Sequence, residues 1–181
     1  MHHRVNTLAA LFLLVGCSGG EPPAQPSDDT PGREDPIEAY RPSAAEEADV
    51  LAAVQALFDA LGSGDEELLR SVVDPSVVMH FSETRDGVTT FGSATLDGLA
   101  TRITSSEVPL IERMWSPVVV VNGALATVWT PYDFYSGTDF SHCGVDAANL
   151  MRTDGGWRIV ALSWTRMQPP ACDTHPDGPP A

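Results

Sequence analysis

The C-terminal half of the chain consists of long segments in which apolar and polar residues alternate, separated by glycine-containing turns. The turn signals stand at residues 122–123 (Asn-Gly), 136–138 (Ser-Gly-Thr) and 154–156 (Asp-Gly-Gly). Asn-Gly is the strongest short hairpin signal, because the favoured two-residue turn needs positive φ at both central positions. Alternation places successive side chains on opposite faces of a strand. The pattern therefore predicts an antiparallel meander, with strands over residues 107–121, 124–135, 140–152 and 157–167.

The segment before the meander follows a helical period. Ser43 and Glu46 form a capping-box pattern, which predicts that a helix starts there. Apolar residues then recur at three- and four-residue steps up to Leu61, as in an amphipathic helix. A short second helix is predicted from Asp65, a short hairpin over residues 77–91, and a third helix from Ser93 or Thr95. Helices followed by an antiparallel sheet indicate the α+β class.

The N-terminus has the proportions of a secretory signal peptide. Arg4 precedes an apolar run over residues 5–15, which is too short to span a bilayer. The run ends in Leu-Val-Gly-Cys at residues 14–17, which resembles the lipobox of bacterial lipoproteins. The resemblance implies a signal peptide over residues 1–16 and a lipidated Cys17, which would anchor the protein in the bacterial cell envelope, facing the periplasm or the exterior. Ordinary secretion with cleavage nearby is the alternative.

Composition predicts a tethered domain. Residues 17–43 are rich in Pro, acids and small polar residues, which is typical of a disordered spacer. The folded domain is expected over residues 44–167, followed by a Pro-rich tail over residues 168–181. The net charge is -15, from 25 acidic residues against 10 basic ones. This balance argues against nucleic acid and against adhesion to anionic lipid, so the lipid on Cys17 is the membrane contact that we expect.

The order of these elements resembles the nuclear transport factor 2-like (NTF2-like) superfamily, also called the SnoaL-like or cystatin-like α+β cone. The residues that carry the resemblance are those at 54–65, Leu69, Asp74 with Pro75, and Gly-Trp-Arg-Ile-Val at 156–160. It implies helices packed in the concave face of a strongly curved, mostly antiparallel sheet, a cone-shaped cavity, and commonly a homodimer through the outer sheet face. Members include steroid isomerases, dehydratases, polyketide cyclases and ligand-binding modules, so the resemblance implies a fold more strongly than an activity.

Three titratable residues are candidates for acid/base catalysis. Enzymes of this superfamily often carry an acid or base on the first strand and another on a later strand, which by position implies His80 with His142 or Asp146. A neutral imidazole can remove a proton next to a carbonyl. His142 and Asp146 share a face but lie about 13 Å apart along a strand. The first-strand carboxylate of the steroid isomerases is missing unless Glu83 replaces it. Alternatively, the histidines are hydrogen-bonded cavity or surface residues.

The cysteines leave several interpretations open. If Cys17 carries lipid, Cys143 and Cys172 remain as a pair that can form a disulfide in an oxidising compartment. Cys143 beside His142 is otherwise a candidate free thiol, and the two cysteines with His142 and His175 are a weaker candidate zinc site. We expect no metal or organic cofactor, because no phosphate-binding loop, nucleophile elbow or repeated metal motif is present.

Aromatic residues are candidates to line a ligand pocket, although they could equally pack in the core. The candidates are Phe58, Trp115, Trp129, Tyr132, Tyr135 and Trp164. The expected function is that of a lipid-anchored module which binds a small apolar ligand or a protein partner. The alternatives are an isomerase or dehydratase that uses His80 with His142 or Asp146, and a subunit whose outer sheet face serves only dimerisation.

Overall fold

The computed structural model describes residues 37–180, so the predicted signal peptide, Cys17 and most of the spacer lie outside the described residues. One short 3-10 helix comes first, η1 (Glu38–Tyr40). The three α-helices are α1 (Ala44–Ser63), α2 (Glu66–Val72) and α3 (Leu96–Ser105). The strands are β1 (Val73–Arg85), β2 (Val88–Ala94), β3 (Leu110–Met114), β4 (Val118–Asn122), β5 (Leu125–Ser136), β6 (Asp139–Thr153) and β7 (Gly156–Arg166).

Local capping explains where the helices begin and end. The Ser43 hydroxyl accepts a hydrogen bond from the Glu46 amide at the start of α1. Gly64 ends α1 with a φ of 70°, a conformation that costs glycine little. Asp65 and Thr95 cap α2 and α3 in the same way as Ser43 caps α1. These caps confirm the helix starts that were predicted from the sequence.

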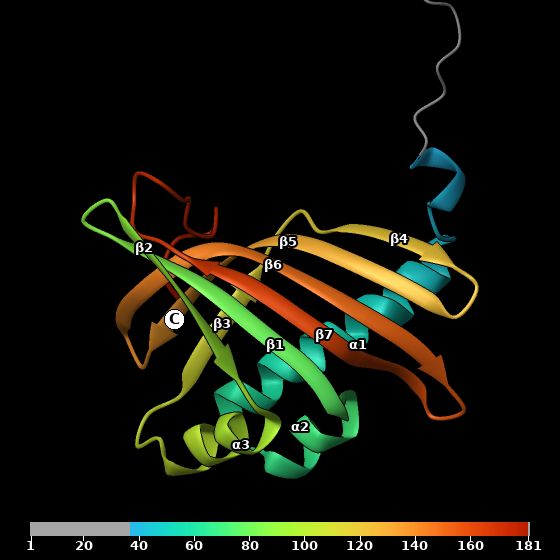
Figure 1. Ribbon diagram of the computed structural model, residues 1–181, viewed down its shortest axis with the longest axis horizontal. Coiled ribbons are helices and arrows are strands. Elements are labelled where there is room, and N and C mark those ends of the chain that lie inside the picture. The colour runs from blue at the N-terminus through green and yellow to red at the C-terminus, as the bar shows by residue number, and fades with distance from the viewer. Residues whose placement is uncertain (1–36, 181) are drawn as a thin grey trace, which may run out of the picture. The chain divides into compact units, whose positions relative to one another are not determined.

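The strands form one sheet in the order β2-β1-β7-β6-β5-β3, and β4 also pairs with β5. All pairs are antiparallel except β1 with β7. Figure 1 shows the sheet curving over α1, with α2 and α3 beside one end of it. The predicted α+β cone is therefore confirmed. No helix within residues 37–180 is long and apolar enough to cross a membrane.

The single strand predicted over residues 107–121 is wrong. The chain leaves β3 after Met114 and re-enters the sheet as β4 at Val118, and both strands pair with β5. Between them Ser116 has a φ of 47°, and Pro117 has no amide hydrogen to donate to a ladder. After this break, β3 packs against α1.

Two register shifts decide which side chains face the concave side. The pairing of β6 with β7 shifts at Val160, so Trp157 and the later residue Trp164 both face the helices, although strict alternation predicted opposite faces. The pairing of β5 with β6 shifts at Ser141, so Phe140 pairs with Tyr135. Phe140 therefore lies on the face opposite to His142, although strict alternation would place the two residues on one face.

Candidate functional site

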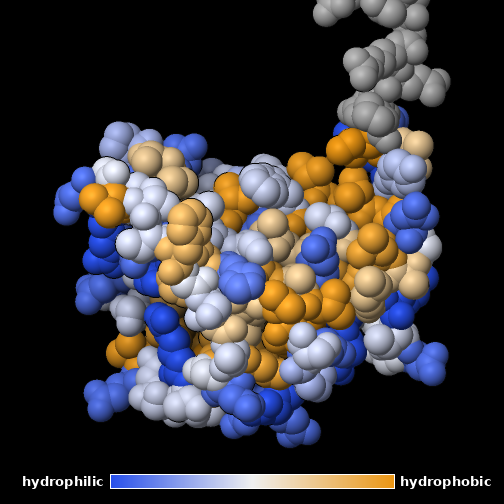
Figure 2. Space-filling view, in the orientation of Figure 1, coloured by the Kyte–Doolittle hydropathy of each residue, from blue (hydrophilic) through white to orange (hydrophobic). Residues whose placement is uncertain are grey.

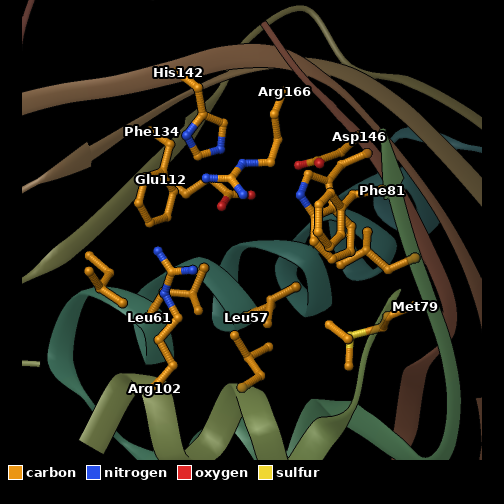
Figure 3. A pocket seen from close by; sticks show the side chains of 15 residues that line it. Leu57, Leu61, Met79, Phe81, Arg102, Glu112, Phe134, His142, Asp146 and Arg166 are labelled. Atoms are coloured by element: carbon orange, nitrogen blue, oxygen red, sulfur yellow. The ribbon is translucent and has the colours of Figure 1, made fainter. Parts of the chain in front are cut away.

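A cavity of about 190 Å³ lies between the concave face of the sheet and helices α1 and α3. Most of its wall is apolar, and these side chains come from α1, β1, α3 and β7: Leu57, Leu61, Met79, Phe81, Leu99, Leu162 and Trp164. Five polar residues complete the lining: Arg102, Glu112, His142, Asp146 and Arg166. Figure 3 shows these polar side chains converging from α3 on one side and the sheet on the other. The combination of an apolar wall and a few convergent polar groups is typical of small-molecule sites.

Two carboxyl groups form the centre of the polar end. Glu112 stands on β3 opposite Phe134, and Asp146 stands on β6 opposite Thr130, so β5 separates their strands. Burial, the charge of Asp146 and a hydrogen bond to Asp146 raise the pKa of Glu112 well above its usual value. Burial raises the pKa of Asp146 to about 7, although the hydrogen bond from Glu112 opposes that rise. Near neutral pH the pair therefore shares a proton that Glu112 donates to Asp146.

Asp146 keeps one oxygen without a partner. Its side chain is 3% exposed, and among the described residues Oδ2 has no hydrogen-bond partner. The buried Nε of Arg166 likewise has none. A buried polar atom without a partner costs about 1–3 kcal/mol. Since Asp146 and Arg166 both line the cavity, a molecule in the cavity that donates to one and accepts from the other would remove this cost.

Two arginines give the polar end its positive charge. Arg166 extends from β7 and lies over the Phe81 ring, 5.6 Å from its centre. Arg102 extends from α3 and lies 5.7 Å from the centre of the Phe134 ring. Figure 3 shows the two guanidinium groups pointing into the cavity from opposite sides. The carboxylate nearest Arg166 is that of Glu83, at 4.0 Å, outside hydrogen-bonding distance.

His142 is neutral at physiological pH. Burial and then the charges of Arg166 and Arg102 lower its pKa to about 4. Its Nδ1 lies 2.9 Å from the Ser141 hydroxyl, and its ring stacks on Phe134 with 4.9 Å between ring centres. These contacts fix the orientation of the imidazole within the cavity wall. A neutral imidazole in this position can accept or donate a hydrogen bond but carries no charge.

The structure brings together only some of the predicted site residues. His142 and Asp146 line the cavity, whereas His80 is exposed and lines an open groove on the other face of the sheet. The reason is that Met79 and Phe81, its neighbours on β1, point inward. Glu83 does not line the cavity either. The expected pairing of His80 with His142 or Asp146 therefore does not exist in this arrangement.

The six aromatic candidates lie in different environments. Trp164 lines the cavity, whereas Phe58 and Tyr135 are buried without reaching it. Tyr132 is buried, donates a hydrogen bond to the carbonyl of Thr165, and has a raised pKa because of that burial. Trp129 is 56% exposed.

The sixth candidate, Trp115, contacts the ring of His175 in the C-terminal tail, with 5.5 Å between ring centres.

Three site residues were not identified from the sequence: Arg102, Glu112 and Arg166. A signal for Glu112 exists, because it replaces an apolar residue between Leu110 and Met114 in an alternating strand. Arg166 follows Trp164 by two residues and so shares its face. Arg102 has no comparable signal, since a charged residue in a surface helix is ordinary.

The C-terminal tail is joined to the outer face of the sheet. Cys143 and Cys172 form a disulfide with 5.8 Å between their Cα atoms. Both thiols are therefore used, which leaves neither a free thiol nor a thiolate ligand at this pair. The His175 amide donates a hydrogen bond to Asp133, which also forms an ion pair with Arg113. Residues 37–180 contain no group of three or more His, Cys, Asp or Glu side chains placed to hold a metal ion.

Comparison with solved structures gives the same fold. A nuclear transport factor 2-like superfamily protein from Salmonella enterica serovar Typhimurium is 13% identical, with a TM-score of 0.55, over 70% of this chain and 94% of its own. A protein from Kribbella flavida is 16% identical, with a TM-score of 0.55, over 67% of this chain and 90% of its own.

A third similar structure is described as a "putative dehydratase from the NTF2-like family" of Streptomyces avermitilis. It is 20% identical, with a TM-score of 0.52, over 68% of this chain and 97% of its own. Identities this low carry the fold and not the activity. No curated protein matches the chain. Residues 45–165 match the family described as "Putative lumazine-binding", and the chain belongs to that family.

Proposed function

We propose that this protein binds a small, flat and mostly apolar ligand in the cone cavity. The observation that carries the proposal is that two buried polar atoms of the cavity lining, Asp146 Oδ2 and Arg166 Nε, have no hydrogen-bond partner among the described residues. A ligand that presents a hydrogen-bond donor and an acceptor side by side would satisfy both atoms. The cavity volume of about 190 Å³ is below the usual range of drug-sized sites, about 300–1,000 Å³, which favours a one- or two-ring molecule.

The family description supports a ligand of this kind. Lumazine is a flat bicyclic molecule whose imide edge carries an N–H group between two carbonyl groups. Phe81 and Trp164 stack on each other beside the cavity, with 5.2 Å between ring centres, and they provide an aromatic wall. Flat heteroaromatic rings pack well against such walls.

The test is a titration with a panel of bicyclic compounds that includes lumazine. We expect saturable binding by calorimetry and quenching of tryptophan fluorescence, because Trp164 lines the cavity. Trp164→Phe should remove most of the quenching, whereas the matched variant Trp129→Phe, on the outer sheet face, should retain it. Asp146→Asn should weaken binding, and Asp49→Asn, on the exposed side of α1, should not. If no member of the panel binds, the proposal fails.

We also propose that Cys17 carries lipid and holds the domain at the bacterial cell envelope. The support is the apolar run over residues 5–15 and the Leu-Val-Gly-Cys sequence that follows it. A disulfide between Cys143 and Cys172 fits an oxidising compartment. The full chain should partition into detergent after expression in a bacterium, and Cys17→Ala should move it to the aqueous phase. Equal partitioning of the two proteins would reject the anchor.

A second candidate function is acid/base catalysis of the isomerase or dehydratase type. It is favoured by the proton that Glu112 and Asp146 share, since burial raises the pKa of Asp146 to about 7, where a carboxylate acts well as a base. Asp146 would remove a proton next to a carbonyl, and Arg166 would stabilise the resulting enolate oxygen. With 2-tetralone in deuterated water, the protein should accelerate deuterium exchange and Asp146→Asn should not. Exchange no faster than in buffer would exclude this candidate.

A homodimer through the outer sheet face remains a proposal. Val118 pairs with Trp129, and Leu125 with Met151, so these four exposed apolar side chains share that face. Figure 2 shows hydrophobic side chains gathered near β4 and the adjacent ends of β5 and β6. A second copy would cover this patch. Trp129→Glu should lower the mass measured by light scattering from dimer to monomer, and a wild-type monomer would reject the idea.

A further inference from the structure

Two arginines of the cavity lack the hydrogen-bonded partners that the other arginines within residues 37–180 have. Arg41, Arg70, Arg85, Arg113, Arg152 and Arg158 all donate hydrogen bonds to carboxylate or carbonyl oxygens. Within residues 37–180, Arg102 and Arg166 donate no side-chain hydrogen bond, and each lies over an aromatic ring instead. In a chain with 25 acidic residues, partners for these cations would be easy to supply. No such partner is present within residues 37–180, so a ligand of the cavity can take this place.

The charges inside the cavity do not balance. Arg102 and Arg166 bring two positive charges, and the hydrogen-bonded carboxyl pair of Glu112 and Asp146 shares a proton and so brings one negative charge. His142, the remaining titratable residue of the lining, is neutral. One positive charge is therefore left uncompensated in a small, mostly apolar space, where an oppositely charged group is strongly attracted.

Glu83 does not supply the missing negative charge. Its carboxylate is 4.0 Å from Arg166, but it is 2.8 Å from Arg85 and does not line the cavity. It therefore forms its close ion pair with Arg85. The buried Nε of Arg166 still lacks an acceptor.

We infer that the ligand of the cavity is an anion, a one- or two-ring molecule whose carboxylate-type oxygen group lies between Arg102 and Arg166 and whose ring lies against the apolar wall. This inference rests on the proposed ligand-binding function and specifies its chemistry. Guanidinium groups suit this role because their planar donors match the oxygens of a carboxylate. Figure 3 shows both groups reaching the same space from α3 and β7, so an oxyanion there can accept from either.

Three probes that share one ring system test the inference: 2-naphthoate, 2-naphthamide and 2-(aminomethyl)naphthalene. Calorimetry at neutral pH should show that the carboxylate binds at least about tenfold more tightly than the amide, and that the ammonium compound binds most weakly. Arg166→Gln and Arg102→Gln should each reduce the preference for the carboxylate over the amide. Arg152→Gln, which removes an exposed arginine outside the cavity that pairs with Glu46, should leave it unchanged. Thermal unfolding of each variant verifies that it is folded.

The outcomes separate the two proposals. If the amide binds as tightly as the carboxylate, or if both arginine variants keep the wild-type preference, the anionic ligand is rejected while binding in the cavity stands. If lumazine binds and none of the three naphthalenes does, the anionic ligand is likewise rejected. If no probe binds at all, the proposed function fails, and the inference fails with it.

Discussion

Replacing Asp146 with Asn should change how the stability of the protein depends on pH. Burial raises the pKa of the Asp146 carboxyl from 3.8 to about 7. Between these two values the folded protein holds a proton that the unfolded chain has already released. The stabilisation from this proton is fully present below the unfolded pKa and is lost as the pH rises through about 7. Asn cannot titrate, so the variant should not suffer this loss.

The size of the effect follows from the two pKa values. Between about pH 5 and about pH 7.5, the titration of Asp146 lowers the free energy of unfolding of the wild type by about 2.5 kcal/mol. This is a large part of the stability of an ordinary domain, about 5–15 kcal/mol. In the variant, Glu112 also loses the charge and the hydrogen bond that help to raise its own pKa. The loss of these two interactions also makes the stability of the variant fall less with rising pH. The free energy of unfolding of the variant relative to wild type should therefore rise by at least about 2.5 kcal/mol over this pH range.

His142 acts in the opposite direction and must be separated from the carboxyl pair. Its pKa falls from 6.5 to about 4 in the folded protein. The unfolded chain then binds the extra proton between these values, so this residue adds about 2 kcal/mol of stability between about pH 5 and about pH 7.5. The wild-type profile alone therefore mixes both effects. The difference between variant and wild type at each pH removes the contribution of His142.

The assay is urea unfolding under non-reducing conditions at four pH values, followed by tryptophan fluorescence. The free energy of unfolding of Asp146→Asn relative to wild type should rise by at least about 2.5 kcal/mol from the lowest to the highest pH. Asp49→Asn is the matched control, because that carboxyl lies on the exposed side of α1, and its difference should be constant. If the Asp146→Asn difference is also constant to within about 0.5 kcal/mol, Asp146 does not hold a proton in the folded state.

Three further substitutions test, by urea unfolding, contacts that hold the sheet and the C-terminal tail together. Cys172→Ser opens a disulfide that spans 29 residues and should cost up to about 3.6 kcal/mol, and a thiol assay of the unreduced wild type should find no free thiol from this pair. Asp133→Asn weakens a fully buried partner of Arg113 and should cost about 3–5 kcal/mol; a cost below about 1 kcal/mol would show that this ion pair contributes little. Gly144→Ala would place a Cβ 2.0 Å from the carbonyl oxygen of Thr165 and should lower the free energy of unfolding by about 3 kcal/mol or more. If the variant is as stable as the wild type, β6 and β7 do not approach each other this closely.

The helices and turns could be predicted because their signals are local. Ser43 caps α1, and Gly64 ends it, through contacts within a few residues. The prediction of one strand over residues 107–121 missed the division of β3 from β4, although Pro117 within that strand is a local signal for the break. The register shifts at Ser141 and Val160 could not be predicted, because a bulge depends on the curvature of the whole sheet and on the partner strand. They decide which residues of β6 and β7 reach the helices.

The part of the site that depends on local alternation along a strand could be predicted from the sequence. His142 and Asp146 share a face by simple alternation, and both line the cavity. His80 was placed with them by analogy of position within the fold, whereas the alternation around it, with Met79 and Phe81 pointing inward, puts it on the other face. Glu112 is 34 residues away from Asp146 in sequence, and the two meet only because β3 and β6 both pair with β5.

The charged residues of the cavity occupy positions where they lower the stability of the fold, and this indicates that they serve a ligand. Glu112 occupies a strand position flanked by the inward-facing Leu110 and Met114, and Arg166 continues the inward face of Leu162 and Trp164. Apolar side chains of similar size at such positions would usually make a domain as stable or more stable. Instead, charged groups from four elements meet around one small cavity and leave buried polar atoms without partners. Departures from local rules that converge on one cavity are expected at a functional site and not in a scaffold.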